Sequence, residues 1–407
     1  MTKDCEGCYH PLIQGVGSNE SLPRAVGLRL KEHVMFWGIL TFLYVYMIIV
    51  SMIVSAGIAF FISVAFTPVV IFLCKKNNWY DEPGARKMHD CAVPRLGGFC
   101  VFFAFFIAAA VYVRFFSGGG YAFAVPLFVG GLVIFLTGII DDFFDLRAKL
   151  KFVMQIAVAL IVALSPLYFR SFLSFTIPPV LGRISTFFWI ILLMNAYNLI
   201  DGLDWLCGGL SFLTLLTVGL LLAYYRSDAG NVYFVLCAAL AGFLVYNKPK
   251  AKIFLGDGGS QTLGYFIAVA PLFAPSGTFA AARFEEVKVV LMLLLMSIPV
   301  TDVIAAVIRR TRDHRAIFSA DRAHIHHKLI NIGFSGGATV AFLLSLQLLI
   351  CLSAIGAVFM RTRKASISLV LVVLGFVWLF FITIHYVNRA VNIKFRGHLA
   401  AEPQEEH

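Results

Sequence analysis

Long apolar segments separated by short polar loops fill the chain between residues 51 and 386. Many of these segments approach the roughly 20 residues that a helix needs to cross a bilayer. There are eleven of them, at about 51–74, 97–115, 121–140, 150–166, 184–200, 208–225, 231–247, 260–275, 286–306, 341–359 and 366–386. The pattern predicts an all-α, polytopic integral membrane protein with about 11 transmembrane helices.

Composition agrees with a membrane location. The chain is 60% hydrophobic and 14% charged, whereas soluble domains carry about 25% charged residues. The net charge of +11 is a property of many nucleic-acid-binding proteins, but basic residues also flank spans on the cytoplasmic side of membranes. We favour the second interpretation and expect no nucleic-acid partner. Eleven spans place 20 of the 33 Lys and Arg residues on one side, which is predicted to be cytoplasmic.

Acidic residues cluster even more strongly on that side. Twelve Asp and Glu residues lie in its loops, whereas the opposite loops hold only Asp228, Glu285 and Glu286. Carboxylates have little influence on topology, so membrane insertion does not explain the clustering. A shared functional site at the cytoplasmic face does.

The first motif of that site is the pair Asp141 and Asp142 at the end of the third span. Ionisable groups at a membrane boundary are costly and indicate function by default. Adjacent carboxylates disfavour each other's charged form unless a cation neutralises them. Lys149 and Lys151 follow closely, and a divalent metal would act in the same way. The alternative is a charged helix end that faces water.

The second motif places oxygen-bearing side chains three residues apart at Asn195, Asn198, Asp201 and Asp204. In a helix this spacing forms one polar ridge, although Gly202 predicts a break before Asp204. Carboxylate and amide oxygens are typical ligands of Mg²⁺. The alternative is a polar helix cap.

The third motif joins Asn247, a lysine-rich turn and the glycine-rich stretch around Asp257. A glycine-rich turn that leads into a helix presents backbone N–H groups to phosphate. The segment 248–252 adds three lysines, and Asp257 is a candidate metal ligand beside that phosphate.

The fourth motif lies in the long loop 307–340, where Arg322, His324, His326 and His327 fall close together. Such histidines bind either zinc or phosphate. We favour phosphate, because the carboxylates elsewhere suit Mg²⁺ rather than zinc. A fifth polar stretch, 81–98, enters the second span through two glycines.

Together the five stretches resemble the polyprenyl-phosphate N-acetylhexosamine-1-phosphate transferases of the glycosyltransferase 4 family, a superfamily that includes the phospho-N-acetylmuramoyl-pentapeptide transferases. The resemblance covers about residues 51–330. The closing segment 319–327 is similar to that of the undecaprenyl-phosphate N-acetylglucosamine-1-phosphate transferases. Trp205 departs from the family pattern, which usually has glycine there.

The resemblance implies a role for each matching residue. Asp141, Asp142 and Lys151 would act in catalysis beside the lipid phosphate, and Asn198 and Asp257 would bind the metal. The substrate-binding residues would be Asp201, Asp204, Asn247, Arg322, His324, His326 and His327.

The implied reaction moves N-acetylglucosamine 1-phosphate from a UDP-sugar to undecaprenyl or another polyprenyl phosphate and releases UMP, with Mg²⁺ or Mn²⁺ as cofactor. We expect a multi-pass protein of the bacterial inner membrane with a cytoplasmic active site. Its reaction would initiate the synthesis of a cell-surface polysaccharide. The sequence leaves open whether the protein forms a homodimer. The alternatives are a phospho-N-acetylmuramoyl-pentapeptide-type transferase and, in another class, a membrane transporter.

The expected organisation has four parts, which follow the hydropathy pattern and the extent of the resemblance. They are an N-terminal extension over 1–50 (polar over 1–34, apolar over 35–50), a catalytic transmembrane core over 51–330, the last two helices over 331–386 and a cytoplasmic tail over 387–407.

Overall fold

The computed structural model describes residues 22–80, 93–115, 125–173, 175–225, 229–273, 279–316 and 323–401. Almost all of them are helical, as the sequence predicted. The helices are α1 (Leu22–Asn77), α2 (Gly97–Phe115), α3 (Val125–Phe144), α4 (Ala148–Ala163), α5 (Pro179–Ile200), α6 (Leu206–Tyr224), α7 (Ala229–Asn247), α8 (Gly256–Val269), α9 (Phe279–Leu295), α10 (Ser297–Arg312), α11 (Ile325–Ile332), α12 (Gly336–Phe359) and α13 (Arg363–Ala401). Two short antiparallel strands, β1 (Ser171–Phe172) and β2 (Phe175–Thr176), pair between α4 and α5.

The described residues confirm a polytopic all-α membrane protein. Eight helices are long and apolar enough to cross a membrane, or nine if the bent pair α9–α10 is one span. Each of the eleven predicted segments overlaps a helix, and 286–306 covers parts of both α9 and α10. However, α4 has 16 residues and α8 has 14. At 1.5 Å per residue these two are shorter than the roughly 30 Å hydrocarbon layer. The number of eleven spans therefore stays a prediction.

The chain divides into two compact units, residues 1–51 and 52–407. In the first unit α1 begins at Leu22, so the apolar segment 35–50 continues the helix of the first predicted span. Residues 1–21, most of the predicted polar extension, lie outside the described part of the chain.

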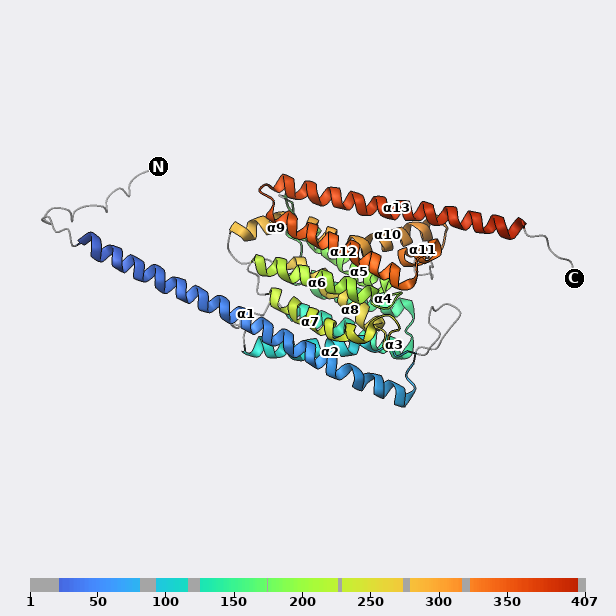
Figure 1. The fold of residues 1–407 in the computed structure, drawn as a ribbon, viewed down its shortest axis with the longest axis horizontal. Helices are drawn as coiled ribbons and strands as arrows, with labels where there is room; N and C mark the ends of the chain where they lie inside the picture. The colour runs from blue at the N-terminus through green and yellow to red at the C-terminus, as the bar shows by residue number, and fades with distance from the viewer. Residues whose placement is uncertain are drawn as a thin grey trace. The chain divides into compact units, whose positions relative to one another are not determined.

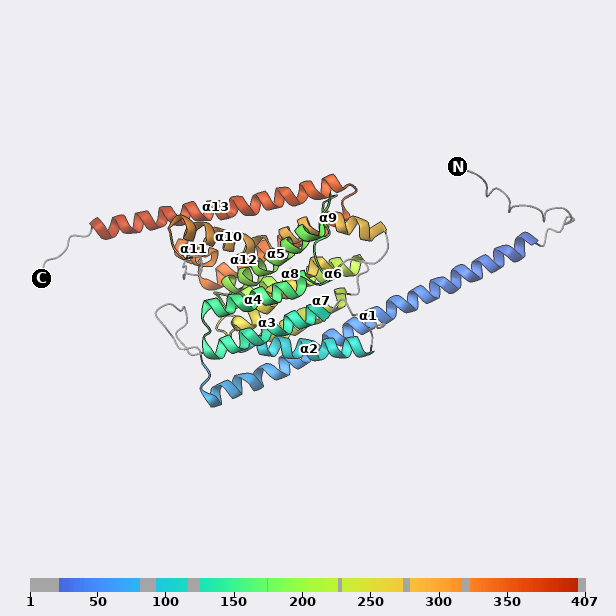
Figure 2. The same cartoon turned by 180° about the vertical axis from the view of Figure 1, so that it is seen from behind.

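Helix α8 lies in the middle of the second unit in both views (Figures 1 and 2), packed mainly against α3 and α5 and also against α2. Every residue from Gly258 to Val269 is buried. Glycines let its neighbours approach closely, since a Cβ on Gly138 of α3 would lie 2.4 Å from the Cα atom of Gly258. Small residues at such contacts are typical of helices packed in membranes. The packing fixes the start of α8 against the end of α3.

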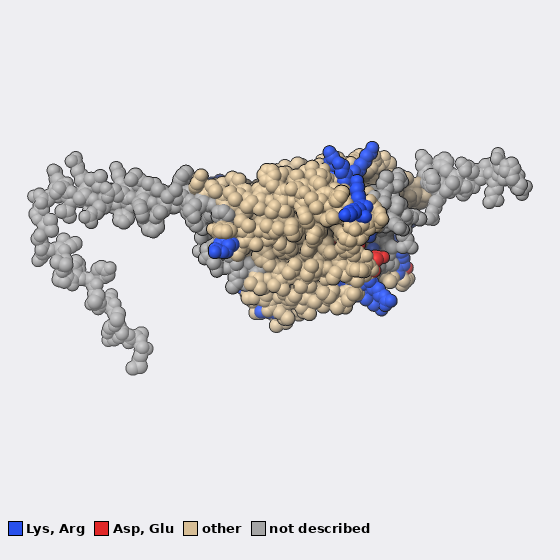
Figure 3. Space-filling model, turned by 90° about the horizontal axis from the view of Figure 1, so that it is seen from below, with Lys and Arg blue, Asp and Glu red and all other residues tan. Residues whose placement is uncertain are grey.

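The surface matches a membrane protein as well. On the face drawn in Figure 3, the broad middle region shows almost no Lys, Arg, Asp or Glu, and basic side chains gather mainly toward one end. Many large apolar side chains of the described residues are exposed, such as Phe61, Phe72 and Leu349 at 61–70%. Lipid tails solvate such a surface, whereas water would not.

The bend of 73° between α9 and α10 has a local cause. Pro299 has no N–H to donate to the carbonyl four residues earlier, which belongs to Leu295. The side chain of Gln347 on α12 donates to that carbonyl at 2.8 Å. A neighbouring helix thus satisfies the freed backbone group, as is usual for prolines in membrane helices. The bend turns α10 toward α5, where the site lies.

Candidate active site

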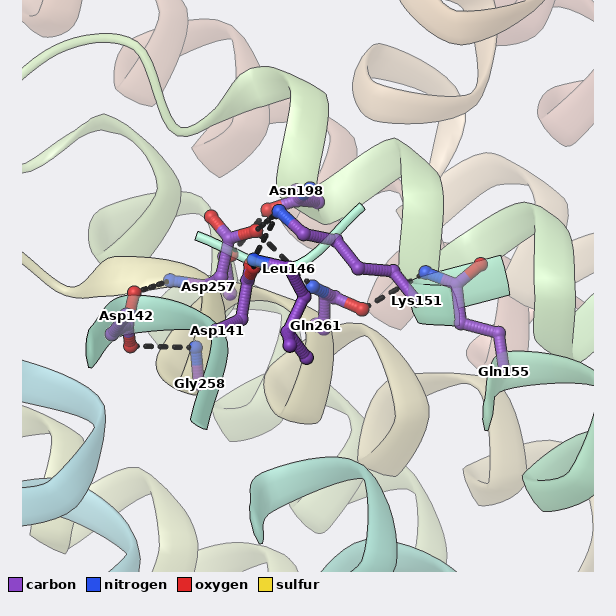
Figure 4. A network of polar contacts seen from close by, with 10 residues as sticks. Asp141, Asp142, Leu146, Lys151, Gln155, Asn198, Asp257, Gly258 and Gln261 are labelled. Carbon is purple, nitrogen blue, oxygen red and sulfur yellow. Dashed lines mark hydrogen bonds and ion pairs between the residues drawn. The ribbon is translucent and has the colours of Figure 1, made fainter. Parts of the chain in front are cut away.

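Three charged side chains meet where α3, α4 and α8 come together (Figure 4). The Lys151 ammonium forms ion pairs with Asp141 and with Asp257, whose Oδ2 atom lies 3.1 Å from Nζ. Asp141 also accepts the Leu146 N–H at 2.8 Å, which closes the turn between α3 and α4. We call Asp141, Lys151 and Asp257 the carboxylate cluster. The lysine contributes a positive charge beside both acids, as the sequence predicted for Asp141.

Asp142, the neighbour of Asp141, points to a different partner. Its two carboxylate oxygens accept the backbone N–H groups of Asp257 at 2.8 Å and Gly258 at 3.0 Å. These donors belong to the first turn of α8, whose N–H groups have no partner within the helix. Asp142 therefore caps α8 from another helix.

This cap bears on two predictions. Asp142 was expected to act in catalysis; both of its oxygens accept main-chain hydrogen bonds, and its catalytic role stays a prediction. The glycine-rich turn was expected to offer backbone N–H groups to phosphate, but Asp142 occupies two of them. The sequence could not separate the two aspartates, because only the rotation of α3 directs one toward Lys151 and the other toward α8.

A chain of polar side chains extends from the cluster into the bundle. Ser260 donates to the Asn198 side-chain oxygen at 2.8 Å, and Gln261 donates to Asp257 at 3.4 Å. Gln155 donates to Gln261 at 2.9 Å. The sequence reasoning missed Gln155 and Gln261, and their signal was a glutamine within each of two predicted apolar segments, 150–166 and 260–275.

The turn between α5 and α6 holds the next two predicted residues. Helix α5 ends at Ile200, so Asp201 is its C-cap and Asp204 lies beyond it, as Gly202 predicted. Burial, reinforced by the charges of Asp257 and Asp204 and opposed by Arg95, raises the pKa of Asp201 to about 8. Asp204 accepts the Ala251 N–H at 3.0 Å through Oδ2, and its buried Oδ1 atom has no hydrogen-bond partner among the described residues.

Asn247 is fully used by the main chain around it. Its oxygen accepts the Trp205 N–H at 3.0 Å, and its amide donates to the Ile253 carbonyl at 2.9 Å. The side chain is 5% exposed. Asn247 therefore ties the α5–α6 turn to the turn before α8, and its predicted contact with a nucleotide stays a prediction.

Trp205 has a backbone conformation that bulky residues rarely adopt. Its φ of 70° lies in the left-handed region, where glycine is at ease and a Cβ is costly. The indole N–H donates to the Leu244 carbonyl at 2.8 Å, which fixes the ring against the end of α7. The ring is 37% exposed. The usual glycine of the family pattern thus has a physical reason at this position, and Trp205 departs from it.

The three histidines at the start of α11 lie on the opposite side of the site, and we call His324, His326 and His327 the histidine segment. The Nδ1 atom of His324 lies 2.7 Å from Asp302 of α10. The His326 ring packs on Gly202, since a Cβ there would lie 2.3 Å from Nε2. Burial, reinforced by the charge of His327, lowers the pKa of His326 to about 3, so this ring is neutral at pH 7.

A cavity of about 640 Å³ connects the two sides of the site. Its polar lining includes Lys151, Asn198 and the histidine segment. Its apolar lining consists mainly of Phe152, Ile191, Leu192, Val303 and Val307. The cavity therefore suits a molecule that carries both an anionic group and an apolar portion.

The predicted metal ligands supply a small donor set. Asp257 and Asn198 offer carboxylate and amide oxygens to the same region (Figure 4), and the described residues contain no group of three or more His, Cys, Asp and Glu arranged for a metal. Magnesium commonly takes one or two protein oxygens and completes its shell with phosphate and water. The residues present fit Mg²⁺ bound together with a phosphate substrate, and they do not fit a closed zinc site.

The structure thus brings eleven of the twelve predicted residues to one end of the second unit. Arg322 lies outside the described residues. Asp302 was not among the predicted residues, although a carboxylate inside an apolar helix is itself a signal.

Comparison with known proteins gives a consistent result. The family model described as glycosyl transferase family 4 matches residues 124–274. The chain is 32% identical over 342 residues to a Bacillus subtilis protein described as "probable undecaprenyl-phosphate N-acetylglucosaminyl 1-phosphate transferase", covering 81% of this chain and 90% of the relative. It is 33% identical over 319 residues to the decaprenyl-phosphate N-acetylglucosaminephosphotransferase of Mycobacterium tuberculosis, covering 70% and 77%. A Yersinia pestis undecaprenyl-phosphate alpha-N-acetylglucosaminyl 1-phosphate transferase is 32% identical over 316 residues, covering 73% and 82%.

Proposed function

The chain belongs to glycosyl transferase family 4, and we propose that it transfers N-acetylglucosamine 1-phosphate from UDP-N-acetylglucosamine to a polyprenyl phosphate, releasing UMP. The family consists of phosphosugar transferases, and this chain is a multi-pass membrane protein. The observation that carries the proposal is the cavity lined by Lys151 together with apolar residues of α4, α5 and α10. A lipid phosphate offers a partner to both kinds of residue.

The acceptor needs little activation, because a lipid phosphate oxygen is already an anion at pH 7. The barrier comes instead from bringing it against the diphosphate of the donor, which is also anionic. Lys151 lines the cavity and lies within 3.1 Å of Asp257, so its ammonium lowers the repulsion at this end. Asn198 and Asp257 would hold Mg²⁺, which supplies further positive charge beside the diphosphate.

We infer a single displacement. An oxygen of the lipid phosphate forms a bond to the phosphorus that carries the sugar, and the bond from that phosphorus to the bridging oxygen breaks, so UMP leaves with the electron pair. The contacts of the aspartates support this route over a covalent intermediate. Asp142 is held by two backbone N–H groups, and Asp141 is engaged by Lys151 and Leu146. Neither carboxylate is presented as a nucleophile.

The distribution of charge supports a cytoplasmic site in the bacterial inner membrane. Most Lys and Arg residues fall in the loops on the side of the carboxylate cluster, which the positive-inside rule assigns to the cytoplasm. The nucleotide sugar would reach the site from that side while the lipid stays in the bilayer.

The proposal is tested with purified protein, polyprenyl phosphate and a panel of UDP-sugars, with UMP release as the measurement. UMP release that requires both the lipid and UDP-N-acetylglucosamine is the expected result. Lack of release with every sugar would refute the transfer, and preference for another sugar would correct the donor. Incubation with radiolabelled UDP-sugar alone tests the route, since a phosphorylated enzyme trapped without lipid would refute single displacement.

A further inference from the structure

Asp302 is a buried carboxylate that the mechanism above does not use. It lies on α10, three residues beyond Pro299, and is 2% exposed. Burial of an ionised carboxylate is costly unless hydrogen bonds compensate. An apolar residue would pack in the same helix without that cost. The retention of a carboxylate here therefore calls for a functional explanation.

Both oxygens of Asp302 contact the start of α11. Oδ2 lies 2.7 Å from His324 Nδ1, and Oδ1 accepts the Ile325 N–H at 2.8 Å. The second contact caps the first turn of α11, whose N–H groups have no partner within the helix. One side chain thus fixes both the helix that carries the histidine segment and the ring of its first member.

The contact with His324 determines where its hydrogen lies. An ionised carboxylate only accepts hydrogen bonds, so Nδ1 of the ring carries the hydrogen. Nε2 is then the ring nitrogen available to the cavity, which His324 lines while being 5% exposed. The hydrogen bond made by one ring nitrogen sets the state of the other in this way at many histidine sites.

We propose that Asp302 is a positioning residue for the transfer reaction, which holds His324 as the Nδ1–H tautomer so that the Nε2 lone pair accepts a hydrogen bond from a hydroxyl group of the bound nucleotide sugar. The inference rests on the proposed function, because it assigns His324 to that site. Asp302 itself touches no substrate and acts through His324 alone. Supporting contacts of this kind typically contribute about 10–100-fold to activity.

Asp302→Asn separates this role from simple capping. The amide keeps one oxygen for the Ile325 N–H, so the cap on α11 remains. Its NH₂ group then faces Nδ1 and donates to it, which moves the ring hydrogen to Nε2. Histidine ring ¹⁵N chemical shifts of the detergent-solubilised protein at pH 7 report that change directly, and His324→Ala identifies the signals of His324. We expect the variant to show the Nε2–H tautomer and to lose about 10–100-fold in UMP release.

A double-mutant comparison tests whether Asp302 acts through His324. In a His324→Ala background, Asp302→Asn should cost less than about twofold, because the ring that it orients is absent. An equal loss in both backgrounds would overturn the proposal. So would unchanged ¹⁵N signals of His324, or wild-type UMP release in Asp302→Asn.

Asn231→Ala is the matched control. Asn231 is 8% exposed and donates to the Tyr112 hydroxyl at 2.6 Å, away from the cavity residues. It should leave the His324 signals and UMP release unchanged. The ¹⁵N measurement needs no substrate, so it decides the tautomer even if the wild-type protein releases no UMP. A wild-type protein that releases no UMP would refute the proposed function, whereas the ¹⁵N result would still test the role of Asp302.

Discussion

Lys151 of the carboxylate cluster lines the same cavity as the histidine segment, but the cluster and the segment are held in different ways. In the cluster, Lys151 lies between Asp141 and Asp257, and ion pairs dominate. In the histidine segment, one carboxylate orients His324, and the neutral ring of His326 packs on Gly202. The first arrangement depends on the balance of charge. The second depends on shape and on the positions of hydrogens.

This difference indicates how each side should respond to substitution. Removing one charge from the cluster leaves another charge without its partner, which is costly in a partly buried place. Altering the histidine segment instead displaces a ring or a hydrogen, with smaller effects. The following experiments test that ranking, beginning with the largest expected effect.

Asp257→Asn should abolish transfer, with a loss of at least about a thousandfold in UMP release. The change removes the charge that pairs with Lys151 and the carboxylate expected to hold Mg²⁺. Purification yield and a single gel-filtration peak would show that the variant still inserts and folds. Asp313→Asn is the control, because Asp313 is exposed and pairs with Arg312 at the end of α10. Near-normal turnover in Asp257→Asn would refute the metal assignment.

Lys151→Met should lower UMP release by about a hundredfold and also lower the melting temperature. Asp141 and Asp257 would then face each other without the ammonium that both contact. Adding Asp141→Asn should restore the melting temperature without restoring activity, because the repulsion disappears while the cation is still missing. Lys149→Met, an exposed change in the same turn, serves as the control. If Lys151→Met alone had the wild-type melting temperature, the idea that ion pairs stabilise the carboxylate cluster would be contradicted.

Gly202→Ala should reduce UMP release by about tenfold, because the new Cβ would lie 2.3 Å from His326 Nε2 and displace that ring. Gly337→Ala in the first turn of α12 introduces the same methyl group with nothing within 4 Å. Activity assays of both variants in parallel check the prediction. If the two behave alike, the packing of His326 on Gly202 does not matter for transfer.

The smallest effect concerns the pH dependence of stability at Asp201. Its pKa in the folded protein is raised to about 8, above the roughly 3.9 of an unfolded chain. The folded state therefore binds the proton more tightly, and stability falls as the pH rises between these two values. Asp201→Asn removes this titration. Its melting temperature relative to the wild type should rise by a few degrees from about pH 5 to 8, and a constant difference would contradict the raised pKa.

Much of the molecule follows from local pattern. Apolar segments of near-spanning length indicated the helices, and all eleven segments overlap helices, although 286–306 is divided between α9 and α10. Gly202 indicated the end of α5 before Asp204, and the acids on one side indicated a shared site. These features depend on residues close together in the sequence, or on the simple alternation of spans across a bilayer.

The exact partners were beyond such reasoning. Pro299 signals a bend, but only the fold shows that Gln347 satisfies the freed Leu295 carbonyl. The lengths of α4 and α8 also differ from full spans, since apolar composition does not reveal whether a helix crosses the bilayer or is surrounded by protein.

The sequence by itself therefore determined the membrane class, the positions of the helices and the set of residues that share one face. Tertiary structure decided which partner each of those residues contacts. It turned Asp141 toward Lys151 and Asp142 toward the start of α8, and it joined Asp302 to His324 across 22 positions of the chain. The physical reason is that hydropathy depends on composition along a segment, whereas the partner of a buried charge depends on how helices rotate and pack against one another.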